Sequence, residues 1–381
     1  MSAPVSPGGG KKTNKAESTL LPIIQGKHGF VPSLVRGLLT ALVPVYAGGL
    51  KLYLLPYRTG LRKQARLGVP VVCVGNLTTG GTGKTPMTQL VCRRLQERGL
   101  RCVVLSRGYG GTNEYGCAIV SDGEKVLLTA ADSGDEPHLL ATSLPGIPVL
   151  VGKDRRVTGA LAVERFQPDI IVLDDGMQFW QLHRDMDVVL VSAIRPFDNG
   201  YPFPRGLLRE PISHLKRASA IVITGLEMAE PADVNNAEKL AARAAPGKPI
   251  YRAGLKAFGL RSVKADGVEY TGAVENLRGI PVGAVCALGN PASFEKLLAS
   301  LGARLVSTAR FRDHAAVSVE ALSDVVQRSE AAGAELLVTT EKDAARINFS
   351  SSSLPAVALQ VNMSIDRETE LIDRIESLVR H

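Results

Sequence analysis

The chain has 381 residues, of which 45% are hydrophobic and 22% charged, enough apolar sequence for one large or two ordinary globular domains. Lys and Arg number 45 against 37 Asp and Glu, so the formal net charge of +8 favours anionic partners such as phosphates, nucleic acid or an acidic bilayer surface. The five cysteines are odd in number and form no CxxC pair, which argues against a disulfide framework and a zinc site and favours a reducing compartment.

The N-terminal part divides into a polar tail and an apolar segment. Residues 1–31 are small and polar, and we expect a disordered tail. Residues 32–66 are strongly apolar, but Arg36 and Lys51 bracket only fourteen uncharged residues, whereas about twenty are needed to span hydrocarbon. Pro44 weakens a straight helix, and a basic cluster follows at once. The segment is therefore predicted to be a helical anchor at the membrane interface and not a cleavable signal, with a helix packed on the protein's own core as the alternative.

Short β-branched runs alternate with helical patterns over residues 67–248, which predicts βαβ units and a mainly parallel sheet with helices on both faces. A β-type linker is expected over 249–275, and a second alternating set over 276–381 predicts a smaller C-terminal α/β domain. The expected strands are 69–77, 101–107, 147–152, 169–175, 187–193, 220–225, 282–288, 335–340 and 356–361. The expected helices are 86–98, 154–166, 291–301, 318–331 and one at the C-terminus.

A glycine-rich segment, GNLTTGGTGKTP, lies between the first of these strands and the first helix. Its glycines allow backbone N–H groups to converge on a phosphate, and the helix N-terminus adds partial positive charge. Lys84 is predicted to reach the β- and γ-phosphates and the Thr85 hydroxyl to ligate Mg²⁺. Thr78 stands where the strict GxxxxGK[ST] pattern has its first glycine, but the GGTGKT core and its context remain. The segment predicts a P-loop NTPase-like fold with these nucleotide-binding residues: Thr78, Thr79, Gly80, Gly81, Thr82, Gly83, Lys84 and Thr85.

Two carboxylates end the expected strand DIIVLDD. Ionised groups at the end of a buried strand are costly unless a positive charge lies beside them. One or both of Asp174 and Asp175 are therefore predicted to bind Mg²⁺, and a capping pair before Gly176 is the alternative.

Phosphoryl transfer to a hydroxyl also needs a group that positions or deprotonates the acceptor. Asp135 and Glu136 lie at a loop-to-helix junction, where an N-cap role for Asp135 is the alternative explanation. His314, in the sequence FRDH, is the second candidate, because a histidine paired with a carboxylate is a better base than either group alone.

Nine motifs occur in the order seen in the tetraacyldisaccharide 4′-kinases of lipid A biosynthesis, and over residues 32–375 the chain resembles that family. The motifs are GNLTTGGTGKTP, SRGYGG, SGDEP, DDGMQ, RDMDVVLV, PRGLLREP, ALGNP, FRDH and TTEKDAAR. The resemblance implies an enzyme at the cytoplasmic face of the bacterial inner membrane, peripheral or monotopic, that moves the γ-phosphate of ATP to the 4′-hydroxyl of a tetraacylated glucosamine disaccharide 1-phosphate. It also implies that Asp135 takes the hydroxyl proton, that His314 is its partner, that Asp174 and Asp175 hold the metal, and that Glu136 is a further ligand.

The resemblance departs at Phe179, where the family usually has a histidine, as DDGxQH. We expect that histidine to support the loop, since neither the metal nor the base assignment needs it. Arg can bind phosphate through two parallel hydrogen bonds, so several side chains are candidates for the substrate. These are Arg155, Arg205 and Arg209, with Tyr109 for the saccharide; Lys342 and Asp343 are interpreted as a helix-start pair without a ligand.

A membrane-bound ATPase switch of the ParA/MinD type is the alternative function, because it also has GGxGKT after a strand. That class carries a lysine just before the paired glycines, where this chain has Thr79. Nucleic-acid binding is not expected, since the basic residues form no long tract and aromatic residues are only 5%. No feature of the sequence specifies an oligomeric state.

Overall fold

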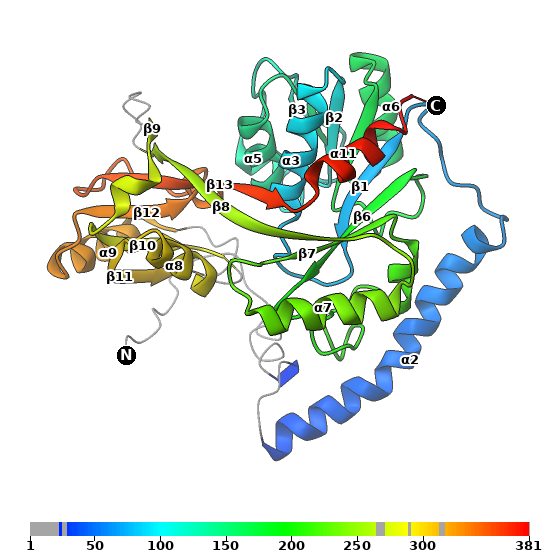
Figure 1. Cartoon of the computed structure of the whole chain (residues 1–381), viewed down its shortest axis with the longest axis horizontal. Coiled ribbons are helices and arrows are strands. Elements are labelled where there is room, and N and C mark those ends of the chain that lie inside the picture. The colour runs from blue at the N-terminus through cyan, green and yellow to red at the C-terminus, as the bar shows by residue number, and fades with distance from the viewer. Residues whose placement is uncertain (1–22, 25–28, 264–270, 289–290, 312–316, 381) are drawn as a thin grey trace.

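The structure is a computed structural model that describes residues 23–24, 29–263, 271–288, 291–311 and 317–380 (Figure 1). Most of the predicted tail, 1–31, lies outside these residues. The strands are β1 (Val71–Asn76), β2 (Cys102–Ser106), β3 (Ala118–Ser121), β4 (Val149–Val151), β5 (Ile170–Asp174), β6 (Met186–Ser192), β7 (Ala220–Thr224), β8 (Ile250–Ser262), β9 (Thr271–Gly272), β10 (Pro281–Cys286), β11 (Arg304–Arg310), β12 (Leu336–Thr340) and β13 (Ala356–Ile365).

The α-helices are α2 (Phe30–Arg58), α3 (Lys84–Glu97), α4 (Ala130–Ser133), α5 (Asp135–Ser143), α6 (Arg155–Phe166), α7 (Pro231–Ala244), α8 (Pro291–Ser300), α9 (Val319–Ala331), α10 (Glu341–Ala344) and α11 (Glu368–Glu376). Two 3₁₀ helices, η1 (Ile212–Arg217) and η2 (Val274–Leu277), complete the described elements. All nine predicted strands and the five predicted helices are present, with ends that differ by a few residues. Asp154 caps α6, because its side chain accepts a hydrogen bond from the Arg156 N–H.

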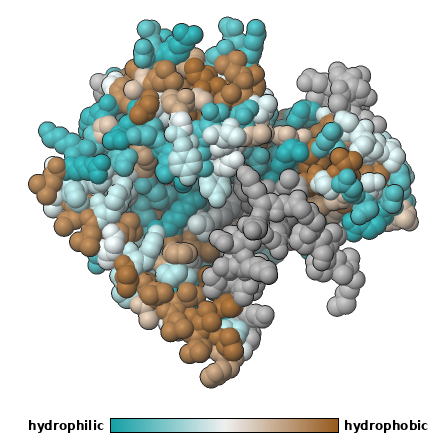
Figure 2. All heavy atoms as spheres, turned by 180° about the vertical axis from the view of Figure 1, so that it is seen from behind, coloured by the Kyte–Doolittle hydropathy of each residue, from teal (hydrophilic) through white to brown (hydrophobic). Residues whose placement is uncertain are grey.

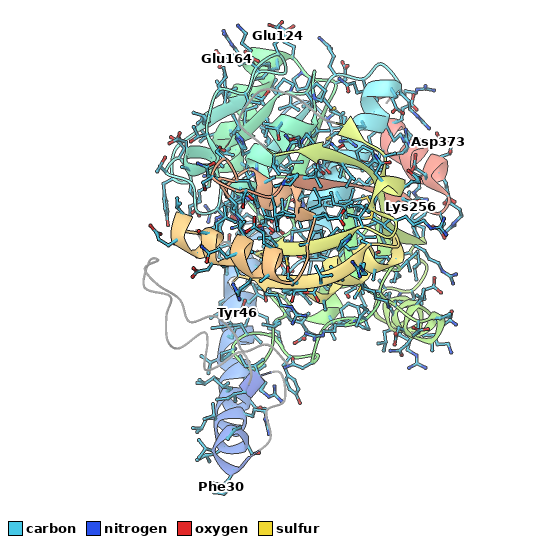
Figure 3. The ribbon with its side chains drawn as sticks, turned by 90° about the vertical axis from the view of Figure 1, so that its left-hand side faces the viewer. Phe30, Tyr46, Glu124, Glu164, Lys256 and Asp373 are labelled. Atoms are coloured by element: carbon cyan, nitrogen blue, oxygen red, sulfur yellow. The ribbon has the colours of Figure 1, made fainter. Side chains whose placement is uncertain are left out.

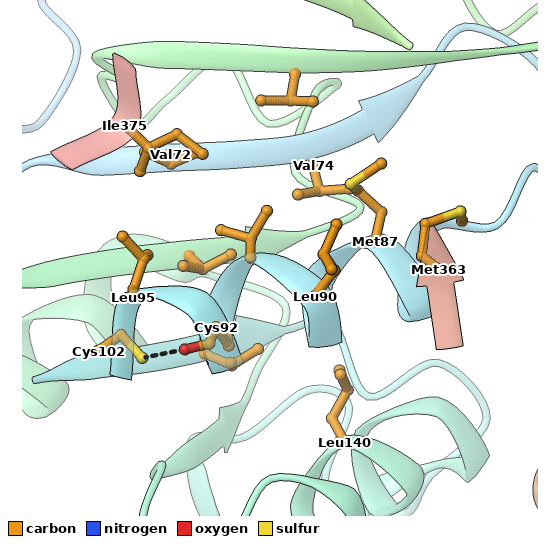
Figure 4. Close-up of a cluster of buried hydrophobic side chains, with 14 of the residues drawn as sticks. Val72, Val74, Met87, Leu90, Cys92, Leu95, Cys102, Leu140, Met363 and Ile375 are labelled. Atoms are coloured by element: carbon orange, nitrogen blue, oxygen red, sulfur yellow. Dashed lines mark hydrogen bonds between the residues drawn. The ribbon is translucent and has the colours of Figure 1, made fainter. Parts of the chain in front are cut away.

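The first lobe is built on parallel strands in the order β7-β6-β1-β5-β2-β4, with β1 pairing β5 and β6. Every residue of β1 is buried, as expected for a strand covered on both faces. Helices α3, α5 and α11 cover one face, and α6 and α7 cover the other. Figure 4 shows Met87 and Leu90 of α3 pointing towards the strand that carries Val72 and Val74. The fold is therefore the predicted α/β arrangement, and it brings the carboxyl ends of the central strands to one edge.

The two lobes share a single sheet within the described residues. Its order is β11-β10-β12-β13-β8-β7-β6-β1-β5-β2-β4-β3, with β9 on β8. The thirteen-residue β8 pairs in parallel with β7 and antiparallel along β13, so it belongs to both lobes (Figure 1). After β13 the chain returns to the first lobe, where α11 packs on α3 and Arg98 Nη1 lies 2.6 Å from Asp373 Oδ1. A domain boundary near residue 276 remains a prediction, and α11 packs with the first lobe.

Helix α2 projects from the body of the protein (Figures 1 and 3). It is long and apolar enough to cross a membrane by length and composition, with a mean hydropathy of 1.6, and Leu54 is its one buried residue among those described. Packing on the protein's own core is therefore not its role. The helix runs without a break through Pro44.

Helix α2 contacts the first lobe through its C-terminal half. Tyr46 Oη donates to the Arg209 carbonyl over 2.8 Å, and Arg58 Nη2 lies 2.8 Å from His214 Nε2. The Tyr46 ring also packs edge-on against Phe203, with centroids 5.8 Å apart. These contacts hold one end of α2 to the lobe and leave the Phe30 end free of it (Figure 3).

Candidate active site

The glycine-rich segment forms the turn between β1 and α3. Gly80 and Gly83 have φ values of 116° and 80°, in the left-handed region that glycine adopts without strain. Gly83 precedes Lys84, the first residue of α3, and no side chain of the described residues caps this helix. Its first N–H groups are therefore available to an anion, which is the property that a phosphate site requires. Residues 79–81 are exposed and Thr82 and Thr85 are buried, so the loop is open on one side and anchored on the other.

The loop is held by the segment that contains PRGLLREP. Thr79 N donates to the Leu207 carbonyl over 2.8 Å, and Arg209 N donates to the Leu77 carbonyl over 2.7 Å. Beneath the loop, Asn76 Nδ2 donates to Thr82 Oγ1 over 2.7 Å. The first contact places Thr79 and the second places Arg209 beside the phosphate-binding turn.

Asp174 lies at the carboxyl end of β5 and is 1% exposed. Thr88 Oγ1 donates to its Oδ1 over 3.0 Å, and Ser106 Oγ lies 3.5 Å from its Oδ2. Burial, together with the negative charges of Glu136 and Asp175, raises the pKa of Asp174 to about 7. Three carboxylates thus share a small region, and a cation there would relieve their repulsion.

Asp175 is held in a different environment from its neighbour. Its backbone has φ 53°, a left-handed conformation that is uncommon outside glycine and that occurs at functional sites. Arg209 Nη1 lies 2.8 Å from Oδ1 and 2.9 Å from Oδ2, and Lys84 Nζ lies 3.8 Å from Oδ2. Burial acts to raise the pKa of Asp175, but Lys84 and Arg209 together lower it. The capping explanation for the pair is therefore not supported, and Asp175 joins Lys84 to Arg209.

Asp135 and Glu136 open α5, which lies next to α3 on the same face of the sheet. The N-cap residue is Gly134, so the capping alternative for Asp135 is wrong. A Cβ on Gly134 would lie 2.8 Å from the Tyr109 carbonyl oxygen, so only glycine allows SRGYGG and SGDEP to pack backbone to backbone. This packing places the start of α5 beside the end of β2, and Glu136 is close enough to raise the pKa of Asp174.

The candidate arginines separate into two groups. Arg209 contacts Asp175. Arg155 is 5% exposed and stacks over the Phe179 ring at 5.3 Å. The Nε atom of Arg155 is buried and lacks a hydrogen-bond partner among the described residues. Burial lowers the pKa of Arg155, and Arg107 lowers it further while Asp175 opposes this. Phe179 thus contacts Arg155 through its ring face. Arg205 instead lies over the Tyr201 ring at 4.9 Å and 3.4 Å from the Ile24 carbonyl, near α2.

Tyr109 is 68% exposed, and Arg107 lies over its ring at 5.7 Å. It therefore projects outward from the loop whose backbone packs on Gly134. His314 lies outside the described residues. The interpretation of Asp343 as part of a helix start is confirmed, because its N–H bonds the Thr340 side chain that caps α10.

Several site residues were missed from the sequence: Thr88, Ser106, Gln178 and Arg346. Thr88 lies one helical turn beyond Thr85, a spacing that could have indicated it. Gln178 links the site, since Nε2 donates to the Asn76 carbonyl over 2.9 Å and Oε1 lies 3.2 Å from Arg209 Nη1. Ser106 begins SRGYGG and Arg346 ends TTEKDAAR, but neither carried a local signal of a role.

Replacing Asp174 with asparagine is expected to stabilise the ligand-free protein at pH 8. The raised pKa means that the folded state binds a proton more tightly than the unfolded state, so stability is lost as pH rises from about 4 to 7. Asparagine removes that loss, and we expect Tm to rise by roughly 2–6 °C at pH 8 and by much less at pH 5. Thermal unfolding at both pH values measures this; an equal or lower Tm at pH 8 would contradict the assignment.

The chain is a P-loop nucleotide-binding enzyme. Its glycine-rich turn joins β1 to the helix that Lys84 opens, and two carboxylates lie at the end of β5, the strand beside β1 in the sheet. The family model described as "Tetraacyldisaccharide-1-P 4′-kinase" matches residues 35–380. The chain belongs to this family of lipid A biosynthesis, which confirms the predicted kinase and sets aside the ATPase switch.

Relatives and a solved structure agree with this assignment. A tetraacyldisaccharide 4′-kinase of Geobacter metallireducens is 40% identical over 87% of this chain and 95% of its own length. One from an Anaeromyxobacter species is 42% identical over 76% of this chain and 77% of its own length. The crystal structure of the "apo" form of LpxK from Aquifex aeolicus in complex with ATP is 29% identical, has a TM-score of 0.73 and covers 91% of this chain and 99% of that one.

Proposed function

We propose that this kinase transfers the γ-phosphate of ATP to the 4′-hydroxyl of a tetraacylated glucosamine disaccharide 1-phosphate, at the edge of the sheet where Lys84, Asp135 and Asp174 gather. The observation that carries the proposal is the placement of two separate carboxylate groups around one phosphate loop. Asp174 ends β5 and Asp175 follows it, and Asp135 and Glu136 open α5, with Lys84 beside Asp175 at 3.8 Å. A nucleotide switch needs only the carboxylates at the end of β5, which bind the metal. Phosphate transfer to a hydroxyl also needs a carboxylate such as Asp135, which accepts the proton.

The donor set fits Mg²⁺. The described residues contain no group of three or more His, Cys, Asp or Glu side chains arranged to hold a metal, but Mg²⁺ is usually held by one or two carboxylates, with phosphate oxygens and water as its other ligands. Thr85 and Asp174 would supply protein oxygens and Glu136 a further one, while the two cations on Asp175 make it the weaker candidate. When bound, Mg²⁺ neutralises charge on the β- and γ-phosphates.

Other residues of the chain bind the phosphates, accept the proton and contact the substrate. Lys84 and the first N–H groups of α3 hold the β- and γ-phosphates, and Arg209, tied to Asp175, keeps a positive charge beside Lys84. Asp135 accepts the proton of the attacking 4′-hydroxyl and orients it in line with the γ-phosphate. By resemblance to the family, His314 is the partner of Asp135. Arg155 and Tyr109 are proposed to face the substrate, whereas Arg205 contacts the Ile24 carbonyl and the Tyr201 ring.

The exposed face of α2 is proposed to rest on a bilayer at the cytoplasmic side, with its long axis near the interface. Its exposed apolar residues recur at helical spacing and cover the projecting end of the molecule (Figure 2): Phe30, Leu34, Leu38, Leu42 and Val45. Arg36 and Lys51 within the helix favour an interfacial position over a span. An acylated substrate would be met at this same surface.

Introducing charge on this face is expected to release the protein from membranes. The double substitution Leu38→Glu and Leu42→Glu should lower the fraction bound to phosphatidylglycerol vesicles about tenfold or more in a sedimentation assay, because carboxylates are poorly tolerated in the acyl region and are repelled by anionic lipid. Val319→Glu, at an exposed apolar residue of α9, serves as the control and should bind like the unmodified protein. Undiminished binding of the double variant would contradict an α2 anchor.

The proposed reaction is tested by mixing the protein with ATP labelled at the γ-phosphate, Mg²⁺ and a lipid A disaccharide precursor. We expect label in the lipid fraction only when protein and acceptor are both present. Release of labelled phosphate without labelled lipid would contradict the proposal and favour a nucleotide switch.

A further inference from the structure

Arg346 of the second lobe contacts the proposed base of the first. Its Nη1 lies 3.4 Å from Asp135 Oδ2, with side-chain exposures of 10% for Arg346 and 19% for Asp135. The two residues are 211 positions apart in the chain. Arg346 follows α10 and Asp135 opens α5, and these two helices are in contact. The pair therefore forms where the two lobes meet.

Hydrogen bonds within the second lobe fix the guanidinium group of Arg346 at the position from which it contacts Asp135. Its Nη2 lies 2.5 Å from Asp343 Oδ1 and donates to the Ala287 carbonyl over 3.0 Å, and its Nε donates to Asp343 Oδ1 over 3.2 Å. Asp343 is fully buried and is itself fixed by Ala287 N at 2.9 Å and Thr340 Oγ1 at 2.8 Å. Two guanidinium nitrogens are thus committed to the ends of β10 and β12, and Nη1 is directed at Asp135. A surface arginine has no such support.

We propose that Arg346 is a positioning residue that orients the Asp135 carboxylate for proton acceptance and joins the second lobe to the active site. The inference rests on the proposed role of Asp135. A carboxylate that accepts a proton must present one oxygen to the acceptor hydroxyl and have its other oxygen restrained. Arg346 supplies that restraint from a scaffold of buried hydrogen bonds, so the base is correctly placed only when the lobes are together.

This role differs from a purely structural ion pair in what it predicts. A structural pair would affect folding or the affinity for ATP, whereas a positioning residue affects kcat and acts only through its partner. Removing Arg346 also leaves the buried Asp343 without its cation, which endangers folding. Conservative variants are therefore the appropriate test.

The experiment measures kcat and KM for ATP in the lipid transfer assay for Arg346→Gln, Arg346→Lys, Asp135→Asn and the double variant Asp135→Asn/Arg346→Gln. We expect Arg346→Gln to lower kcat about 10- to 100-fold with KM for ATP within about twofold, since a positioning residue can lose at most what the base contributes. Arg346→Lys keeps the charge and should recover part of this loss. In the Asp135→Asn background, Arg346→Gln should cause no further loss, because the two residues act as one unit.

Arg328→Gln, at an exposed arginine of α9, is the matched control and should retain full kcat. Thermal unfolding shows whether each variant folds. If Arg346→Gln does not fold, Arg346→Lys and the double variant Asp135→Asn/Arg346→Lys take its place in the comparison of single and double variants. Unchanged kcat in Arg346→Gln, or losses that multiply in the double variant, would overturn the inference while leaving the proposed function standing. If Asp135→Asn itself retains full transfer, the proposed role of Asp135 fails and the inference fails with it.

Discussion

Replacing Asp135 with alanine is expected to lower kcat for lipid phosphorylation by about 10²- to 10⁴-fold, the range that a general base contributes. The affinity for ATP should change by less than about threefold. Asp135 is at the first position of α5, separate from the phosphate loop at the start of α3, and it contacts Arg346 of the second lobe. Losing the carboxylate therefore removes proton acceptance and leaves the nucleotide contacts in place.

The measurement pairs steady-state transfer with ATP binding by isothermal titration. Glu124→Ala, which removes an exposed carboxylate from the same lobe, is the control and should behave as the unmodified protein. If Asp135→Ala loses ATP affinity and kcat in equal measure, Asp135 belongs with the metal ligands and the assignment of the base is wrong.

Replacing Lys84 with alanine is expected to lower kcat/KM by about 10³-fold or more, because a buried positive charge directed at the transferring phosphate is a major source of transition-state stabilisation. The Lys84 side chain is 10% exposed and lies beside Asp175. Arg209 remains on Asp175 at 2.8 Å in the variant, so the carboxylate keeps a cation and the fold should survive.

For Lys84→Ala, transfer kinetics should be read together with a thermal unfolding curve. We expect near-normal Tm, weakened ATP binding and transfer close to background, while Lys125→Ala, an exposed lysine, should be unaffected. A Lys84→Ala variant that keeps transfer within tenfold of the unmodified protein would exclude this residue from charge stabilisation.

The elements that the sequence predicted share strong local signals. β1, β5 and β7 are continuous buried apolar runs, and α9 has an amphipathic pattern capped by Ser318. Helix α7 and strand β11 lack such signals and are among the elements that were missed. The apolar face of α7 consists largely of alanine, and β11 is an edge strand whose residues are mostly exposed or half-buried. Because few large apolar side chains of α7 and β11 are buried, their sequences show little hydrophobic periodicity, and tertiary contacts fix these elements.

The site was predictable in its residue types and less so in its geometry. The phosphate loop, Asp174 and the start of α5 could be found because each is a local motif at an element boundary. The contacts of Arg209 with Asp175 and of Arg346 with Asp135 join residues 34 and 211 positions apart. No local pattern encodes such pairs, since they depend on how the strands are ordered in the sheet and how the lobes meet.

The proposed reaction moves one phosphate from ATP to one hydroxyl of a lipid-linked disaccharide, with Lys84 on the phosphates and Asp135 on the acceptor hydroxyl. Phosphorus and proton NMR of the isolated lipid product, with ADP counted in parallel, tests it most directly. We expect one new phosphate monoester at the 4′ position and one ADP for each lipid modified. ADP formation with an unmodified lipid, or a phosphate at any other position, would contradict the account.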